Sequence, residues 1–273
     1  MANDYEQIKE AHELPDSVIE KEIVHIDELF NKALQDGYVA GSDVTSLFAN
    51  TDFQEGVKEG WESNMNKWAN GTSTVTINNK PYVGCEAWNT KFDMHQTVKG
   101  LKPGYYLVSV QGAFRPSNDR YSYNYAAQVY ANDNTNYLQS VIEDYVGVDA
   151  VNDGENVYLS QFGGGDATFD WPIYEDGFST SGEAGLKGYV LHGPSGVAVA
   201  GYAGRCKNYI IAKTEGDSLT IGICNPGTNY GNDWTGFTSF NVVYAGEGDE
   251  AETYVDKALE SMLARANALF ETF

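Results

Sequence analysis

The chain has 273 residues, and its 39 acidic and 17 basic side chains give a formal net charge of −22 at pH 7. A charge of this sign repels the phosphate backbone over a Debye length, so it excludes nucleic acid as a partner. No run of residues approaches the ~18 apolar positions that a membrane-spanning helix requires. The length favours one large β-domain with helical appendages over two separate cores.

The first predicted element is an amphipathic helix over residues 17–36. Ser17 and Glu20 have the spacing of a capping box, and Gly37 supplies a stop signal. Apolar residues recur between them at helical spacing, at Ile19, Ile23, Ile26, Phe30, Ala33 and Leu34. We therefore assign residues 1–40 to an N-terminal helical segment.

Short strands are predicted over residues 41–247, where alternating or apolar runs lie between clusters of Gly, Pro, Asn and Asp. The clearest strand, residues 105–114, follows a Pro-Gly turn. The other strands are predicted at residues 74–77, 128–131, 209–213, 218–223 and 239–244. Residues 144–188, rich in Gly and Asp, are predicted to be a long excursion of the kind that often carries function. Scattered strands with long loops favour a jelly-roll sandwich over a meander barrel.

A second amphipathic helix is predicted in the C-terminal segment, residues 248–273. Asp249 and Glu252 repeat the capping spacing. One apolar stripe follows, at Val255, Leu259, Met262, Leu263, Ala266 and Phe270. The two helices either pack on each other or on the sandwich, or they join neighbouring modules of a longer protein.

Catalytic and metal-binding patterns are weak in this sequence. Three widely spaced cysteines exclude a disulfide framework and a zinc site, and we expect them to be buried, with pairing of Cys206 and Cys224 left open. The four histidines lack metal-ligand spacing, and His95, in a strand-like run, is expected to be a surface or hydrogen-bonded residue. Candidate carboxylates for glycoside hydrolysis are Glu86, Asp93, Asp119, Asp166, Asp170, Glu175 and Asp176. The sequence singles out no pair among them.

Five segments carry a resemblance to a known family. They are residues 43–61, 87–115, 128–132, 206–225 and 231–246. Over residues 43–246 the chain resembles β-sandwich modules with the galactose-binding-domain-like jelly roll, found in secreted and surface proteins of gut-dwelling Gram-negative anaerobes. The resemblance implies an all-β sandwich with adjacent ends, flanked here by the two amphipathic helices. It also implies a noncatalytic, extracytoplasmic, carbohydrate-binding module without a cofactor.

The sequence departs from the resembled family at a structural calcium site. Related modules often show Asn-x-x-Phe-Glu at the opening and Asp-Asn-Phe near the close, and the Glu and Asp help to hold calcium. Here the opening ends in Gln54 and the closing triplet is Thr238, Ser239 and Phe240. Because calcium requires anionic oxygen ligands, we predict no metal at this site, although Asp43 and Asp52 remain in the opening segment.

Sugar binding calls for aromatic faces beside amides, carboxylates or Arg, and three loops offer them. The predicted ligand-binding residues are Arg115, Asp119, Arg120, Tyr121, Tyr123, Asp170, Trp171, Tyr174, Asn225 and Tyr230. In contrast, Trp61, Trp88 and Trp234 are predicted to fill the core. The favoured partner is a polysaccharide or glycan, with other modules of a longer chain as further candidates. The alternative functions are a structural or adhesive spacer that binds protein and, less favoured, a glycoside hydrolase with two facing carboxylates.

Overall fold

The computed structural model describes the β-domain and parts of the flanking segments. The described residues are 21, 24, 25, 37–56, 59–64, 71–115, 125–141, 143, 146, 147, 171, 172, 188–191, 193–202, 204–216, 218–227, 233–256, 259, 260, 263 and 264. Among them, no helix is both long enough and apolar enough to cross a membrane. The predicted helix over residues 17–36 lies almost wholly outside this set, and so does half of the predicted C-terminal segment, residues 248–273.

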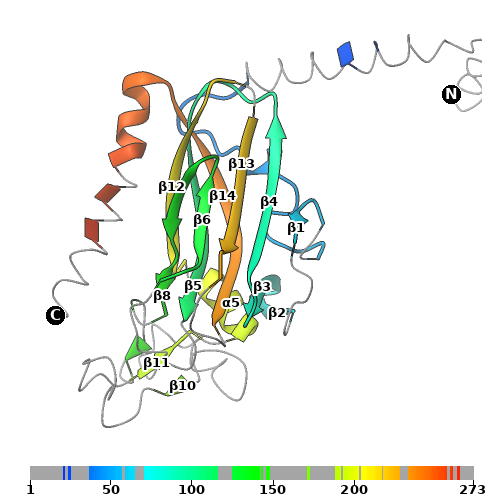
Figure 1. Cartoon of the computed structure of the whole chain (residues 1–273), viewed down its shortest axis with the longest axis vertical. Coiled ribbons are helices and arrows are strands. Elements are labelled where there is room, and N and C mark those ends of the chain that lie inside the picture. Colours follow the sequence, from blue (N-terminus) through cyan, green and yellow to red (C-terminus); the bar gives the residue numbers. More distant parts are fainter. Residues whose placement is uncertain are drawn as a thin grey trace, which may run out of the picture.

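Two sheets form the body of the molecule (Figure 1). The five-stranded sheet has, in spatial order, β1 (Glu62–Ser63), β4 (Phe92–Lys99), β13 (Ser218–Asn225), β6 (Gln128–Ala131) and β7 (Asn134–Tyr137). The six-stranded sheet has β12 (Lys207–Thr214), β5 (Gly104–Arg115), β14 (Trp234–Gly246), β3 (Lys80–Trp88) and β2 (Thr72–Ile77), with β8 (Gln139–Ser140) beside β5. The all-β class is confirmed, and the architecture is consistent with a sandwich.

A third, small sheet falls mainly within the predicted excursion. It contains β10 (Trp171–Pro172), β11 (Gly188–Val190) and β9 (Val146–Gly147). The other residues of 144–188 lie outside the described part of the chain, so their interpretation as a functional excursion stays a prediction.

The core lies between the two main sheets because their strands alternate apolar and polar residues. In β4, Phe92 and Met94 are buried while Asp93 and His95, between and after them, are only partly covered. Val108 and Val110 of β5 meet them from the six-stranded sheet, as members of one apolar cluster. Each strand that the sequence predicted is present.

The first and last parts of the β-domain lie side by side, as the sequence predicts. Asp43 pairs with Val243 in an antiparallel bridge. Gly41 donates its backbone N–H to the carbonyl of Tyr244 at 2.8 Å. The short helix η1 (Thr45–Leu47) follows this contact, and η3 (Gly248–Ala251) follows β14. The chain therefore enters and leaves the β-domain at one end.

The sequence did not predict the α-helix at residues 193–202. The helix α5 (Gly193–Tyr202) packs on the outer face of the six-stranded sheet, chiefly on β3 and β2 (Figure 1). Gly84 of β3 permits this approach, because a Cβ atom there would lie 2.7 Å from the backbone nitrogen of Ala198. The sequence of α5 is rich in Gly and small apolar residues, which hid its helical character.

The predictions for tryptophan and cysteine have mixed outcomes. Trp61 is buried in the core, as expected, and Trp234 is buried at 2% exposure, although outside the main cluster. The prediction for Trp88 is wrong, because this side chain lies on the outer face of β3 and is 41% exposed. All three cysteines are free, with Cys85 and Cys206 buried and Cys224 partly buried.

Candidate functional site

The outer face of the five-stranded sheet presents polar side chains from all five strands. Alternation along β4 turns Asp93, His95 and Thr97 outward, opposite to the core. The pairing of β13 with β4 places Cys224 opposite Asp93 and Gly222 opposite His95. The other sheet carries α5 on its outer face, so the two outer faces differ in character.

Two rows of side chains cross this face because residues in register on adjacent strands share a side. One row contains Asp93, Cys224, Gln128 and Tyr137 on β4, β13, β6 and β7. The other contains Glu62, His95, Gly222, Tyr130 and Thr135, and it begins on β1. Since adjacent strands lie about 4.8 Å apart, the first row spans about 14 Å.

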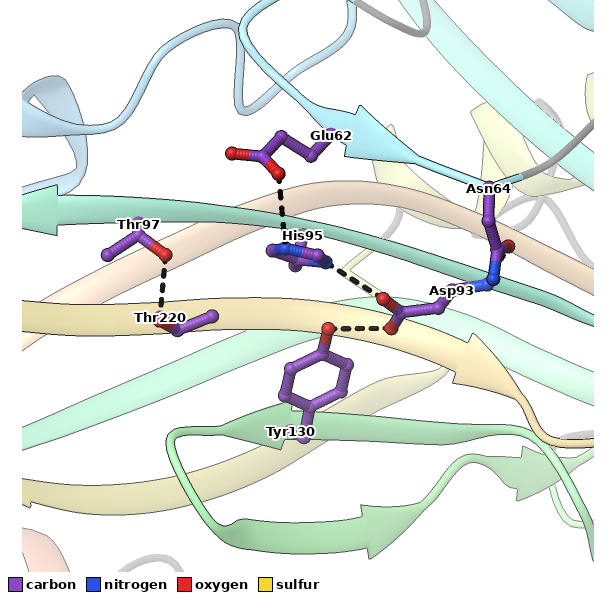
Figure 2. Close-up of polar contacts among 7 residues, drawn as sticks. All are labelled: Glu62, Asn64, Asp93, His95, Thr97, Tyr130 and Thr220. Atoms are coloured by element: carbon purple, nitrogen blue, oxygen red, sulfur yellow. Dashed lines mark hydrogen bonds and ion pairs between the residues drawn. The ribbon is translucent and has the colours of Figure 1, made fainter.

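Asp93 is the centre of a hydrogen-bond network on this face (Figure 2). The hydroxyl of Tyr130 donates to Oδ1 of Asp93 at 2.6 Å, and Nδ1 of His95 lies 2.8 Å from Oδ2. The backbone N–H of Asp93 donates to Oδ1 of Asn64 at 2.8 Å. Both carboxylate oxygens are thus engaged, which fixes the orientation of the side chains around them.

Gly222 is what allows Tyr130 to reach Asp93 across the intervening strand. Tyr130 is directly opposite Gly222 in the register of β6 and β13. A Cβ atom on Gly222 would lie 2.6 Å from both Cε1 and the hydroxyl oxygen of Tyr130. The Tyr130 ring therefore lies over the glycine, and any larger residue at 222 would displace it.

The network leaves hydrogen-bond acceptors at the surface. Because a carboxylate can only accept, Nδ1 of His95 carries the proton of the bond to Asp93. Nε2 lies 3.7 Å from Oε2 of Glu62, whose side chain is 83% exposed. Burial and, to a lesser extent, the bond to Asp93 raise the pKa of Tyr130, so the phenol remains a neutral donor. The exposed edge of the site thus favours ligands that donate hydrogen bonds.

Aromatic and hydroxyl side chains flank the network. Tyr137 is 48% exposed, and its ring centroid lies 6.1 Å from that of Tyr125. On the other side of His95, the hydroxyls of Thr97 and Thr220 share a hydrogen bond of 2.8 Å. The half-exposed Tyr137 ring thus lies in line with the amide of Gln128 and the carboxylate of Asp93.

At His95, the described residues do not form an acyl-transfer site. Nε2 of His95 faces the carboxylate of Glu62, whereas acyl transfer needs a hydroxyl or thiol nucleophile there. Among the residues that the structure describes, no group of three or more His, Cys, Asp or Glu side chains could hold a metal ion.

The two described carboxylates of the predicted hydrolase set lie on opposite sides of the molecule. Glu86 of β3 shares its face with Gly84 beneath α5, and its Oε2 accepts a hydrogen bond of 2.7 Å from Nε1 of Trp234. Asp93 faces outward from the other sheet. These two groups cannot flank one glycosidic bond. The other five candidates, Asp119, Asp166, Asp170, Glu175 and Asp176, lie outside the described residues.

Two of the predicted sugar-binding residues are fully described, and both are buried. Arg115 ends β5 at 4% exposure, and its guanidinium lies 5.9 Å from the centre of the Trp234 ring. Asn225 ends β13 at 2% exposure, and its Oδ1 accepts a hydrogen bond from the backbone of Gly227 at 3.1 Å. Both strands end toward the same end of the sandwich (Figure 1). The structure thus places the start of two predicted loops at a common end.

The other predicted ligand-binding residues stay predictions. Only the backbone of Trp171, in β10, is described. The remaining ones, Asp119, Arg120, Tyr121, Tyr123, Asp170, Tyr174 and Tyr230, lie outside the described residues.

The opening segment, where the sequence predicts no metal, is held by hydrogen bonds from neutral side chains. Nε2 of Gln54 donates to the carbonyl oxygen of Pro81 at 3.0 Å, which a glutamate could not do. Nδ2 of Asn50 donates to the carbonyl of Glu59 at 3.1 Å, and the carbonyl of Thr51 accepts from Phe240 at 2.9 Å. The Gln54 amide thus binds the carbonyl oxygen of Pro81. Carbonyl oxygens are also ligands for calcium, so the amide stands where a cation could bind.

Sequence reasoning found parts of this site but not its organisation. His95 was expected to be a surface or hydrogen-bonded residue, and this is confirmed. Asp93 was considered only as one of seven acidic candidates. Tyr130 and Glu62 were missed because their relation to Asp93 depends on the order β1, β4, β13, β6, which sequence alone does not reveal.

Comparison with known proteins adds no assignment. No protein family matches this sequence, and no curated protein is significantly similar to it. The resemblance to galactose-binding-like modules therefore stays a prediction.

Proposed function

We propose that this protein is a noncatalytic glycan-binding module of a secreted or cell-surface protein, with a galactose-binding-like jelly-roll fold. We further propose that the outer face of the five-stranded sheet is its sugar-binding surface. The observation that carries the proposal is the row of Asp93, Cys224, Gln128 and Tyr137 across that face.

The row supplies both kinds of contact that a pyranose needs. The exposed ring of Tyr137 offers a surface for the apolar side of a sugar ring. Gln128 and the acceptors around Asp93 and Glu62 can then receive its hydroxyl groups. The bonds to Asp93 hold Tyr130 and His95 in place, so these two side chains lose little conformational entropy on binding.

The charge of the chain narrows the class of glycan. A net charge of −22 repels uronate-rich and sulfated polysaccharides over about a Debye length. The carboxylates of Glu62 and Asp93 near the centre of the face are unfavourable for an anion as well. Neutral polysaccharides are therefore the expected ligands.

The position of the domain ends supports a binding module over a spacer. Asp43 and Val243 are bridged, so the chain enters and leaves the β-domain at one end. A module attached in this way projects sideways from its connections and adds little length between them. Its faces and its far end are then free to meet a ligand.

The proposal is tested with a glycan array followed by calorimetry on the polysaccharide that binds. Tyr137→Ala is expected to weaken binding at least about tenfold, which is about 1.4 kcal/mol. Asp93→Asn is expected to weaken it as well, because the Asp93 charge holds both Tyr130 and His95. The matched control is Trp88→Ala, which removes an exposed aromatic side chain from the other sheet.

These measurements test the sugar-binding function and the position of the binding surface separately. If no neutral glycan binds, the function is wrong. If a glycan binds and Trp88→Ala abolishes binding while Tyr137→Ala does not, the protein binds sugar elsewhere and the sheet face is wrong.

A further inference from the structure

The edges of the two sheets are protected unequally. Edge strand β1 has only two residues and carries Glu62. Edge strands β7 and β12 are joined by side chains, since Asn134 and Asn136 of β7 donate to backbone carbonyls of β12. Edge strands are kept from pairing with other chains when they are short, carry charged side chains or are covered by another part of the protein. Among the described residues, the remaining edge strand, β2 (Thr72–Ile77), shows none of them.

The hairpin register shows which backbone groups of β2 are open. The turn residues Asn78 and Asn79 both have positive φ, 51° and 63°, as in a two-residue type I′ hairpin. Ile77 and Lys80 therefore form the closing hydrogen-bonded pair, and Thr76 falls opposite Pro81, which has no N–H. By alternation, the N–H and C=O groups of Thr72, Thr74 and Thr76 point away from β3. In the described part of the chain, β3 is the only strand paired with β2.

The composition of β2 favours pairing with another strand. Its sequence is Thr-Ser-Thr-Val-Thr-Ile, in which every residue except Ser73 is β-branched. It has no charged side chain, although the chain as a whole carries −22. The three outward-facing residues, Thr72, Thr74 and Thr76, are all exposed.

We propose that β2 pairs antiparallel with β2 of a second copy of this chain, about a two-fold axis at Thr74. In this register Thr74 meets Thr74 of the second copy, and Thr72 meets Thr76. Every outward-facing residue then meets an outward-facing residue, and three hydrogen-bonded pairs form six backbone hydrogen bonds. Shifting the register in either direction leaves some of these groups unpaired.

The second copy fits this edge because the strand is self-complementary. Thr–Thr pairs on opposite strands are favourable, and a two-fold axis places no like charges opposite each other within β2. Each copy of the chain carries a net charge of −22, but β2 itself has no charged side chain. The electrostatic repulsion between the two copies is therefore long-range. The association is therefore expected to strengthen with added salt, whereas one based on ion pairs would weaken.

The dimer has a consequence that rests on the proposed function. A two-fold axis through an antiparallel strand pair is perpendicular to the sheet, so the two six-stranded sheets form one continuous sheet. Both five-stranded sheets then lie on the same side of it, and their outer faces point the same way. Two sugar-binding faces on one side would bind a polysaccharide with avidity.

The test is sedimentation equilibrium of the full chain, from about 1 to 300 µM, at low salt and in about 0.5 M NaCl. A dimer that strengthens with salt is expected. Thr74→Pro removes an N–H that β3 does not use, which edge strands tolerate, and should weaken the dimer at least about tenfold. Thr74→Lys keeps the backbone intact and places two cations opposite each other, with the same expected result.

A control and a cross-link complete the design. Thr135→Lys introduces the same charge at an exposed position of β7 and should leave the dimer unchanged. Thr74→Cys should form an intermolecular disulfide, because paired Cα atoms lie about 5.5 Å apart. Thr76→Cys should not, because its two copies would be about 13 Å apart.

The proposal is overturned if the chain is monomeric over the whole range. It is equally overturned if the dimer survives Thr74→Pro and Thr74→Lys in chains whose circular dichroism shows native folding. None of these measurements involves a glycan, so their outcome is independent of the sugar-binding test.

Discussion

Asn136 donates a side-chain hydrogen bond of 2.9 Å to the backbone carbonyl of Tyr209, and this bond joins the edges of the two sheets. Asn134 makes the same bond to Ile211 at 2.7 Å, and Asn132 makes it to Lys213 at 3.3 Å. Alternate residues of β7 and the turn before it thus bind alternate carbonyls of β12. One side of the sandwich is closed by side chains in place of a strand.

Loss of one bond in this ladder should weaken the fold measurably. Asn134→Ala leaves the carbonyl of Ile211 without its protein donor, so we expect a loss of about 1 kcal/mol in the free energy of unfolding. Urea denaturation measures it. Thr135→Ala is the control, because its side chain faces the other side of β7, and its effect should stay below about 0.5 kcal/mol. Equal losses in both variants would contradict a role for the amide.

The sequence predicted the strands well but could not predict this ladder. Asn132, Asn134 and Asn136 look like turn-forming residues next to residues 128–131, because Asn is common in turns and rare in strands. Their role depends on β12, which lies more than 70 positions later in the sequence. Contacts between the two sheets leave no pattern in the local sequence from which they could be predicted.

The packing of α5 on the six-stranded sheet depends on Gly84. A Cβ atom at this position would collide with the backbone carbonyl of Pro194 and approach the nitrogen of Ala198 at 2.7 Å. Both are backbone atoms, so the helix must shift as a body. Gly84→Ala is expected to lower the free energy of unfolding by about 1–3 kcal/mol, measured by thermal denaturation.

The control for that variant is Gly37→Ala, where an added Cβ atom meets nothing within 4 Å. An unchanged or slightly raised melting temperature is expected there, because alanine narrows the unfolded ensemble. If Gly84→Ala were as stable as the unmodified chain, α5 would not rest on β3 as described.

In the candidate site, the outward-facing residues could be predicted from the sequence, but the contacts between strands could not. The alternation around Asp93 and His95 is readable, because each second residue of a half-buried strand faces solvent. The contact between Tyr130 and Asp93 could not be predicted from the sequence, because it depends on the position of β13 between β6 and β4 and on the glycine at position 222. The buried positions of Arg115 and Asn225 were equally hidden, since both residue types are usually exposed.

Stability at acid pH should depend on Asp43. Its carboxylate accepts hydrogen bonds from Thr45 at 2.9 Å and from Asn241 at 3.1 Å, and so ties the start of the domain to β14. The bond with Thr45, and more weakly that with Asn241, lower the pKa of Asp43 against the opposing effect of burial. A lowered pKa stabilises the folded state above the unfolded value of 3.8, and this stabilisation is lost as the pH falls through the folded value.

Asp43→Asn should therefore flatten the dependence of stability on pH below about pH 4 and cost about 1 kcal/mol at neutral pH. Denaturation in urea at a series of pH values measures both. Asp133→Asn changes an exposed carboxylate in the turn between β6 and β7 and is the matched control. A steeper acid dependence in Asp43→Asn than in the unmodified chain would contradict the assignment.

Stability at alkaline pH should depend on the tyrosines near the joined domain ends. The hydroxyl of Tyr244 donates to the carbonyl of Pro103 at 2.8 Å, and that of Tyr106 donates to the carbonyl of Lys102 at 2.7 Å. Burial raises the pKa of both phenols, that of Tyr244 to about 12. Because the folded pKa is the higher one, the stabilisation is complete below the unfolded value of 10 and is lost as the pH rises toward 12.

Tyr244→Phe should separate this effect from general alkaline unfolding. The variant loses one hydrogen bond, so its stability at pH 8 should fall by about 1 kcal/mol. Its further loss between pH 10 and pH 12 should be smaller than that of the unmodified chain, because one of the titrating groups is gone. If Tyr244→Phe unfolds with the same alkaline slope as the unmodified chain, the Tyr244 phenol does not control stability in this range.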